Sequence, residues 1–110
     1  MNKIYSLLHQ LGISSNYTGF YPTADAINLC IQQQDRLVLV TKRLYPEIAK
    51  RHGTNWKNIE HHIRTISKLA WTRNRPLLEQ VAEIPLQRPP SASSFLAVLS
   101  FHLLHNSNTD

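Results

Sequence analysis

The sequence predicts an all-α fold, a compact bundle of about six helices that contains a central helix-turn-helix. Apolar residues recur at helical spacing along almost the whole chain. Only 3 glycines are present, so strands joined by tight hairpins find little support. The chain has 110 residues, 42% of them hydrophobic and 17% charged, which suffices for one packed core and argues against disorder.

The first helix is predicted from an apolar stripe at positions i, i+3, i+4 and i+7, formed by Ile4, Leu7, Leu8 and Leu11. Gly12 follows where a helix C-cap is expected. Residues 14–22 are rich in turn-forming and aromatic residues and predict a loop that packs on the body. Thr23 is then expected to cap a second helix, whose apolar side chains are Ala26, Ile27, Cys30 and Ile31.

The middle of the chain predicts three helical segments. Residues 37–40 could form a buried strand, but no partner strand is apparent, so we expect a short helical segment that runs to Leu44. Pro46 lacks a backbone donor and suits a first turn, which predicts a helix over residues 46–52. After a break at residues 53–55, one apolar face continues from Trp56 to Trp71, and it includes Ile59, Ile63, Ile66, Leu69 and Ala70.

The C-terminal third predicts two more helices and a tail. Pro76, preceded by Asn74 or Arg75, suits the first turn of a fifth helix. Residues 85–90 form an extended loop, and a serine at position 91, 93 or 94 is expected to cap a last helix over residues 95–104. That helix is apolar on more than one face, which fits burial better than a contact between neighbouring copies of the chain. We expect residues 1–105 to be a single domain and residues 106–110 to be a disordered tail.

Two helices joined by a three-residue turn that contains glycine match the helix-turn-helix unit, over about residues 45–71. Ala49 is small, which lets the second helix cross closely, and Gly53 stands where the turn requires a positive φ. Ile59 fills the space between the two helices. The second helix of such a unit enters the major groove of DNA.

Basic charge is concentrated on this unit. Between Lys42 and Arg75, nine basic side chains stand against two acids, which gives +7, so the rest of the chain sums to −2 of the total of +5. This distribution is what phosphate contact requires, and it predicts double-stranded DNA as the partner. Lys57, His61, Arg64, Thr65 and Lys68 are expected opposite the apolar stripe, and Asn58 flanks that face. The candidate base readers are Asn58, Glu60, His61, Arg64 and Thr65. The candidate phosphate-binding residues are Lys50, Arg51, Thr54, Asn55, Lys57, Lys68 and Arg73. For any one of these residues the alternative is a solvated helix face, and Glu60 can also simply pair with Arg64 at i, i+4.

Other function classes find little support. No histidine pair at i, i+4 comes with a carboxylate that would complete a metal site, so we expect no metal. No phosphate loop, nucleophile motif or paired carboxylates appear, so we expect no cofactor and no enzyme activity. The one cysteine, Cys30, is expected to be a buried thiol of a cytoplasmic protein. No apolar run approaches the length that a membrane requires.

Several motifs resemble those of one known family. These are the block TKRLYPEIAKR at residues 41–51, the pairs at 59–60 and 63–64, and LAWTRN at residues 69–74. Further matches are LGI at 11–13, GF at 19–20 and PSASSFLA at 90–97. Together they resemble the C-terminal DNA-binding effector domain of the master sporulation response regulator, the stage zero sporulation protein A family, over roughly residues 11–104.

The resemblance implies a helical domain that binds a short promoter box, usually as tandem copies, and that contacts the RNA polymerase sigma factor. Of the family's base-reading pattern, only Glu60 and Arg64 are retained, so general DNA binding carries over better than the target sequence. The family protein also has a phosphorylated receiver domain, which is not part of these 110 residues. The chain is either free-standing or an excised domain of a longer response regulator.

The principal rival is a protein-interaction module that kept this fold and binds RNA polymerase or another regulator with little DNA sequence specificity. The departures at Asn58 and His61 support it. RNA binding is less favoured because no aromatic stacking platform accompanies the basic face.

Overall fold

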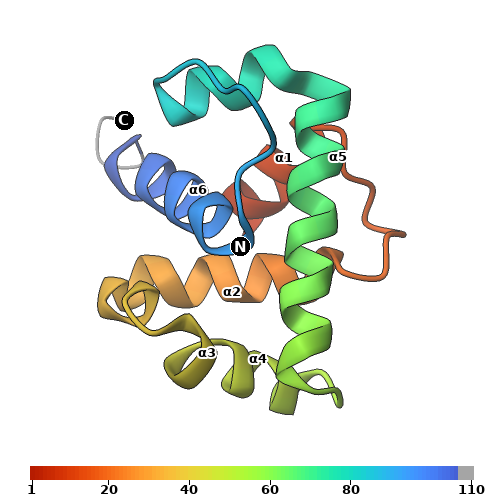
Figure 1. Ribbon diagram of the computed structural model, residues 1–110, viewed down its shortest axis with the longest axis vertical. Coiled ribbons are helices and arrows are strands. Elements are labelled where there is room, and N and C mark those ends of the chain that lie inside the picture. The colour runs from red at the N-terminus through yellow and green to blue at the C-terminus, as the bar shows by residue number, and fades with distance from the viewer. Residues whose placement is uncertain (107–110) are drawn as a thin grey trace.

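The structure, a computed structural model, describes residues 1–106, and within that range it contains six α-helices, one 3₁₀ helix and no strand. The all-α prediction is confirmed. In Figure 1, α2 crosses the middle of the molecule, α6 lies beside it, and α5 runs along one side of both. The helices are α1 (Asn2–Gln10), α2 (Phe20–Gln32), the 3₁₀ helix η1 (Gln34–Leu37), α3 (Val40–Arg43), α4 (Tyr45–Arg51), α5 (Trp56–Ala82) and α6 (Ala92–Asn106).

The core is centred on α6, which both α2 and α5 contact. Phe95, Leu96 and Leu99 are fully buried and belong to one apolar cluster with the inner faces of the other helices. Neighbours on more than one side explain why α6 is apolar on more than one face. The predicted burial of this helix is therefore confirmed for most of its length, and Phe101 is its exposed large apolar side chain.

The first helix forms as predicted. Its apolar stripe from Ile4 to Leu11 is buried, and the helix ends at Gln10, with Leu11 as its C-cap residue. Gly12 follows with φ +95°, a backbone conformation that side chains other than glycine rarely adopt.

The start of α2 differs from the prediction. The helix begins at Phe20, one turn before Thr23, and Gly19 is its N-cap residue. Phe20 is buried, and its ring lies 5.6 Å from that of Tyr5 and 5.2 Å from that of His9, so packing against α1 extends the helix toward its N-terminus. Pro22 is tolerated because the first-turn N–H groups have no intrahelical acceptor. Thr23 is instead buried inside α2, and its hydroxyl has no hydrogen-bond partner among the described residues.

The segment before α4 is helical, as expected, but it consists of two short pieces, η1 and α3. A buried strand is ruled out because Val38 and Leu39 are exposed, to 77% and 43%. The guanidinium of Arg36 holds the two pieces to α4. It donates to the carbonyl of Arg43 at 2.8 Å and to the carboxylate of Glu47 at 2.7 Å, and its side chain is only 17% exposed.

The hydrogen bond from Arg36 holds the pKa of the Glu47 carboxyl below its ordinary value, and the guanidinium of Arg51 acts in the same direction. A carboxyl whose pKa is lower in the folded chain stabilises the fold above its unfolded pKa. That stabilisation is lost as the pH falls through the lowered pKa.

The break predicted between two helices near Pro76 is present as a kink. Hydrogen bonding continues along α5, but Asn74 has non-helical dihedrals, φ −151° and ψ 61°. Its side-chain oxygen accepts from the N–H of Leu77 at 3.3 Å, as an N-cap residue does, and its side-chain nitrogen donates to the carbonyl of Gln10 at 2.8 Å. The straight first part of α5 thus ends at Arg73, two residues beyond the predicted end. The second part turns back over the bundle (Figure 1).

The last helix begins earlier than residue 95 and ends later than residue 104. The hydroxyl of Ser91 accepts from the N–H of Ser94 at 3.2 Å, so Ser91 is the capping serine, and α6 starts at Ala92. The preceding loop is attached to α5, since the buried hydroxyl of Ser67 donates to the carbonyl of Pro90 at 2.7 Å. Asn106, expected in the tail, is the last residue of α6. The rest of the predicted disordered tail, residues 107–110, lies outside the described residues.

The loop before α2 packs closely on α5. A Cβ atom built on Gly19 would lie 2.6 Å from the Cβ of His62, and 3.4 Å from its Cα. Because both of those atoms are fixed to the helix backbone, neither can rotate away. Partial burial at this contact lowers the pKa of His62, and the neighbouring His61 adds to the effect.

We therefore expect Gly19→Ala to lower the free energy of unfolding by about 1–3 kcal/mol, the usual effect of overpacking. Urea titration followed by circular dichroism measures it. Adding His62→Gly removes the opposing Cβ, so the loss caused by Gly19→Ala should shrink in that background. An equal loss in both backgrounds would contradict the contact. Gly53→Ala is the matched control, since a Cβ there meets nothing within 4 Å and only the positive φ opposes it.

The contact between Arg36 and Glu47 predicts a pH-dependent effect. Glu47→Gln keeps an oxygen for Arg36 but removes the charge, so the variant should be less stable than the natural chain at pH 7. At pH 3 the difference should be smaller, because the natural carboxyl becomes protonated as the pH falls toward its lowered pKa. Urea titrations at both pH values test this, with Glu83→Gln at an exposed position as the control. A difference that is the same at both pH values would argue against the ion pair.

Candidate nucleic-acid interface

The turn between α4 and α5 has the geometry that the spacing of small and branched residues predicts. Gly53 has φ +65°, and the N–H of Thr54 donates back to the carbonyl of Ala49 at 2.9 Å. Ala49 and Ile59 are both buried where the two helices cross. Asn55 is extended, and its side-chain oxygen accepts from the N–H of Asn58 at 3.0 Å, so Asn55 begins α5 as its N-cap.

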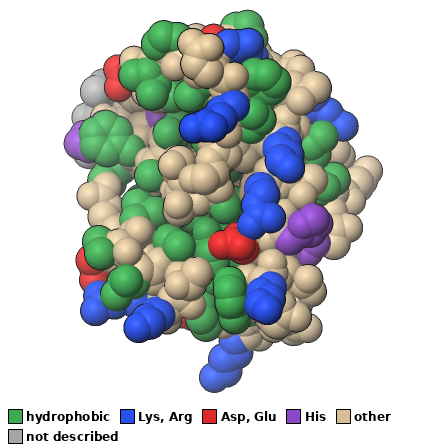
Figure 2. All heavy atoms as spheres, in the orientation of Figure 1, with side chains coloured by type: hydrophobic (Ala, Val, Ile, Leu, Met, Phe, Trp, Pro, Cys, Tyr) green, Lys and Arg blue, Asp and Glu red, His purple; other side chains and the backbone are tan. Residues whose placement is uncertain are grey.

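One side of α5 is buried and the opposite side is bare. Ile59, Ile63 and Ile66 are fully buried, as predicted. The candidate residues of α5 that are exposed outside this stripe are Lys57, Asn58, His61, Arg64 and Lys68, and Glu60 is half-buried. Thr65 is half-buried, and its hydroxyl donates to the carbonyl of His61 at 2.9 Å. Figure 2 shows Lys and Arg side chains spaced along α5 on this bare side, with histidine beside them.

Trp56 does not belong to the buried stripe in which the sequence places it. It is 37% exposed, and the ammonium of Lys57 lies 5.8 Å from the centre of its ring. Trp56 has the same angular position on α5 as Ile63, but it lies two turns nearer the N-terminus, at the end of the helix where fewer neighbours can cover it.

Arg64 and Glu60 form an ion pair on the bare side. Their closest atoms, Nη2 and Oε1, are 2.7 Å apart, at the i, i+4 spacing. The side chains are 47% and 33% exposed, so the pair adds little to stability. Its effect is to hold the guanidinium over the helix surface.

The polar residues at the start of α5 hold one another in place. The side-chain amide of Asn58 donates to the hydroxyl of Thr54 at 2.9 Å, while Asn55 caps the helix. Lys57 lies in the same turn. The structure thus brings four candidate residues together at the N-terminus of α5, where the unpaired backbone N–H groups favour an anion.

Two candidate arginines are engaged with their own chain. Arg51 contacts Glu47 at 2.7 Å and Asp25 at 3.2 Å, and Asp25 also lies 3.1 Å from a ring nitrogen of His52. This network joins α4 to α2. The i, i+4 spacing of Glu47 and Arg51 was a sequence signal for one of these pairs, whereas no local signal marks Asp25.

Arg73 lies at the far end of the straight part of α5, about 24 Å from Lys57 at 1.5 Å per residue. Its guanidinium donates to the carbonyl of Gly12 at 2.7 Å, and a Cβ atom built on Gly12 would lie 2.8 Å from the Cβ of Arg73. Arg73 therefore joins α5 to the end of α1. Lys50 and Lys68 are both exposed, on α4 and α5 respectively.

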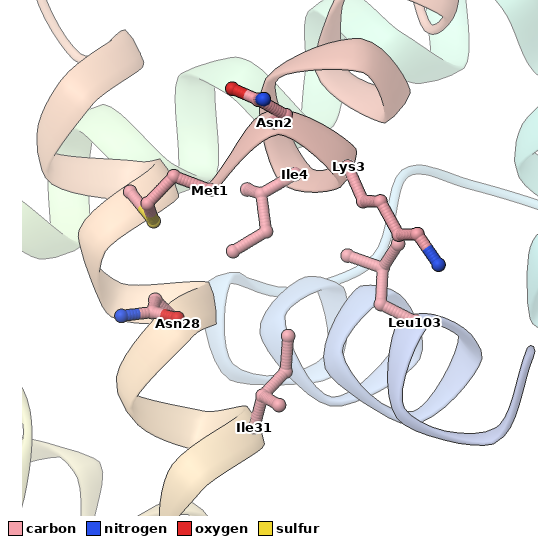
Figure 3. Close-up of a pocket in the computed structure, with 7 residues that line it drawn as sticks. All are labelled: Met1, Asn2, Lys3, Ile4, Asn28, Ile31 and Leu103. Carbon is pink, nitrogen blue, oxygen red and sulfur yellow. The ribbon is translucent and has the colours of Figure 1, made fainter. Parts of the chain in front are cut away.

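A hollow of about 410 Å³ lies away from this face. It is lined by residues of α1, α2 and α6 and by none from α4 or α5, and Figure 3 shows Ile4, Ile31 and Leu103 pointing toward it. Within residues 1–106, no three His, Cys, Asp or Glu side chains group as metal ligands would. No helix in that range is long and apolar enough to cross a membrane.

The comparison with protein families agrees with this arrangement. The family model described as the C-terminal domain of the sporulation initiation factor Spo0A matches residues 4–103, which include every helix from α2 to α5 and most of α1 and α6. The match spans the helix-turn-helix and the contacts that α5 makes at Gly19 and at Asn74. The chain therefore belongs to the family of Spo0A C-terminal domains, the DNA-binding effector domains of sporulation initiation.

Proposed function

We propose that this chain is a sequence-specific, double-stranded DNA-binding transcription regulator that inserts residues 56–71 of α5 into the major groove. The observation that carries the proposal is the bare, basic side of α5, which lies opposite a fully buried stripe and directly follows the turn from α4. A helix anchored on one side and uncovered on the other is what groove insertion requires.

Phosphate contacts come from two kinds of group in this proposal. Lys50, Lys57 and Lys68 are exposed ammonium groups that can neutralise phosphates. Thr54 and Asn55 add polar groups at the N-terminus of α5. Each guanidinium has five N–H donors, and those of Arg51 and Arg73 that do not bond within the chain can bind phosphate.

The residues that contact bases in this proposal lie at the start and in the middle of α5. Arg64 suits the two acceptors of guanine, and Asn58 suits adenine. Glu60 can accept from the amino group of cytosine, or keep its bond to Arg64 and hold that guanidinium ready. His61 and Thr65 complete the proposed reading set.

Membership of the family supports two further parts of the proposal. Copies of the domain sit in tandem on DNA in the cytoplasm, and the domain contacts the RNA polymerase sigma factor. A pull-down of the sigma factor on promoter DNA, with and without the domain, tests the second part.

The first experiment is selection of binding sites from a randomised duplex library, with the selected duplexes retested over a salt series. We expect a sharply enriched motif and an affinity that falls steeply with salt, because several lysines neutralise phosphates. Absence of enrichment, with only weak binding, would favour the protein-interaction alternative.

Substitution of two neighbouring basic residues separates base reading from phosphate binding. Arg64→Ala should cost about 1–3 kcal/mol on the selected site and relax specificity at one base pair. Lys68→Ala should weaken binding to all duplexes alike and lower the salt slope by about one unit. Fluorescence anisotropy of labelled duplexes measures both. Equal and small losses from the two substitutions would contradict base reading by α5.

A further inference from the structure

The indole of Trp56 is a large aromatic side chain that the core does not cover. Tryptophan is highly buried in most proteins, yet Trp56 is 37% exposed at the first residue of α5. The other tryptophan, Trp71, is half-buried against the core cluster. The exposure of Trp56 is therefore a local property of the start of α5.

The position of Trp56 places it beside the proposed reading residues. Trp56, Glu60 and Arg64 follow one another at four-residue spacing, so they form one row along α5. Helical side chains lean toward the N-terminus, so Trp56 covers the tip of the helix. In helix-turn-helix proteins, the N-terminal residues of the second helix are those that meet base edges.

The indole ring of Trp56 is largely apolar, which limits the groups of a base that it can contact favourably. Most groups that bases present in the major groove are hydrogen-bond donors or acceptors, and the apolar exception is the methyl group of thymine. The ring of Trp56 can cover such a methyl group, while the ammonium of Lys57, 5.8 Å from the ring centre, meets the adjacent phosphate.

We propose that Trp56 is a specificity-determining residue that packs on a thymine methyl group. This thymine lies at the end of the binding site that faces the N-terminus of α5, away from the base that Arg64 contacts. The inference rests on the proposed function, because it requires α5 to enter the major groove.

Replacement of each thymine of the selected duplex by uracil tests the contact, because uracil lacks only the methyl group. For the natural chain, one such replacement at the predicted end should weaken binding about fourfold, the worth of one buried methyl group. Trp56→Ala should bind the thymine duplex more weakly and lose sensitivity to that replacement. Trp56→Phe, which keeps an apolar ring, should retain part of it, and Arg64→Ala should retain it fully.

If no single uracil replacement distinguishes the natural chain from Trp56→Ala, the proposal is wrong. The same holds if the sensitive position coincides with the base pair at which Arg64→Ala relaxes specificity. Thermal melting of each variant checks that it is folded, and because Trp56 is only 37% exposed, Trp56→Ala should lower the melting temperature while the chain stays folded.

Fluorescence gives a second readout that does not depend on affinity. The chain has 2 tryptophans, so Trp71→Phe leaves Trp56 as the sole indole. This substitution removes no hydrogen bond, because the indole nitrogen of Trp71 is buried without a partner among the described residues. On addition of the selected duplex, quenching of Trp56 emission by acrylamide should decrease.

A fluorescent label on the duplex reports DNA binding independently of Trp56, so failure of the thymine contact can be told from failure of DNA binding. Binding of the labelled duplex with unchanged quenching of Trp56 would overturn the thymine contact and leave the proposed function intact. No binding of any duplex would overturn both. Protection of Trp56 by RNA polymerase but not by DNA would assign the exposed ring to a protein partner instead.

Discussion

The packing of one side of α5 against α2, α4 and α6 is the contact on which the rest of the structure depends. Ile59, Ile63 and Ile66 are fully buried in it, and each contributes about 1.5–3 kcal/mol by leaving water. This burial fixes the rotation of α5 about its axis, and thereby decides which side chains face out. The joints at Gly19 and at Asn74 then fix its position along the axis, since neither leaves room for α5 to slide.

Most of the helices could be predicted from the sequence because their signals are local. The spacing of apolar residues predicted α1 and the straight part of α5, and Pro46 predicted α4. Gly12 and Gly53 marked turns in which φ is positive. The bare side of α5 followed from the same periodicity, so the exposure of His61 and Arg64 was predictable before any neighbour was known.

Contacts between distant parts of the chain could not be predicted in this way. Thr23 has the chemistry of an N-cap, but packing of Phe20 on α1 starts the helix a turn earlier. Arg73 has the charge of a phosphate ligand, yet its guanidinium bonds to a carbonyl 61 residues away. The angular position of Trp56 on α5 is that of the apolar stripe, but the core ends before it reaches the first turn of α5, so Trp56 is 37% exposed. The periodicity of apolar residues predicts which way a side chain points from its helix, but it does not predict which other part of the chain lies there.

The uneven charge of the chain has a consequence before any contact is made. A segment of +7 over residues 42–75, in a chain whose net charge is +5, concentrates the positive charge on α3, α4 and most of α5, although Asp25, Asp35 and Glu79 form ion pairs with it. Near a polyanion, this asymmetry exerts a torque that turns the side formed by α3, α4 and α5 toward the source of the field, over a range of about 10 Å at 0.1 M ionic strength. A larger share of collisions therefore begins in a productive orientation than if the same net charge were spread evenly, so the arrangement of charge governs how fast the molecule is captured.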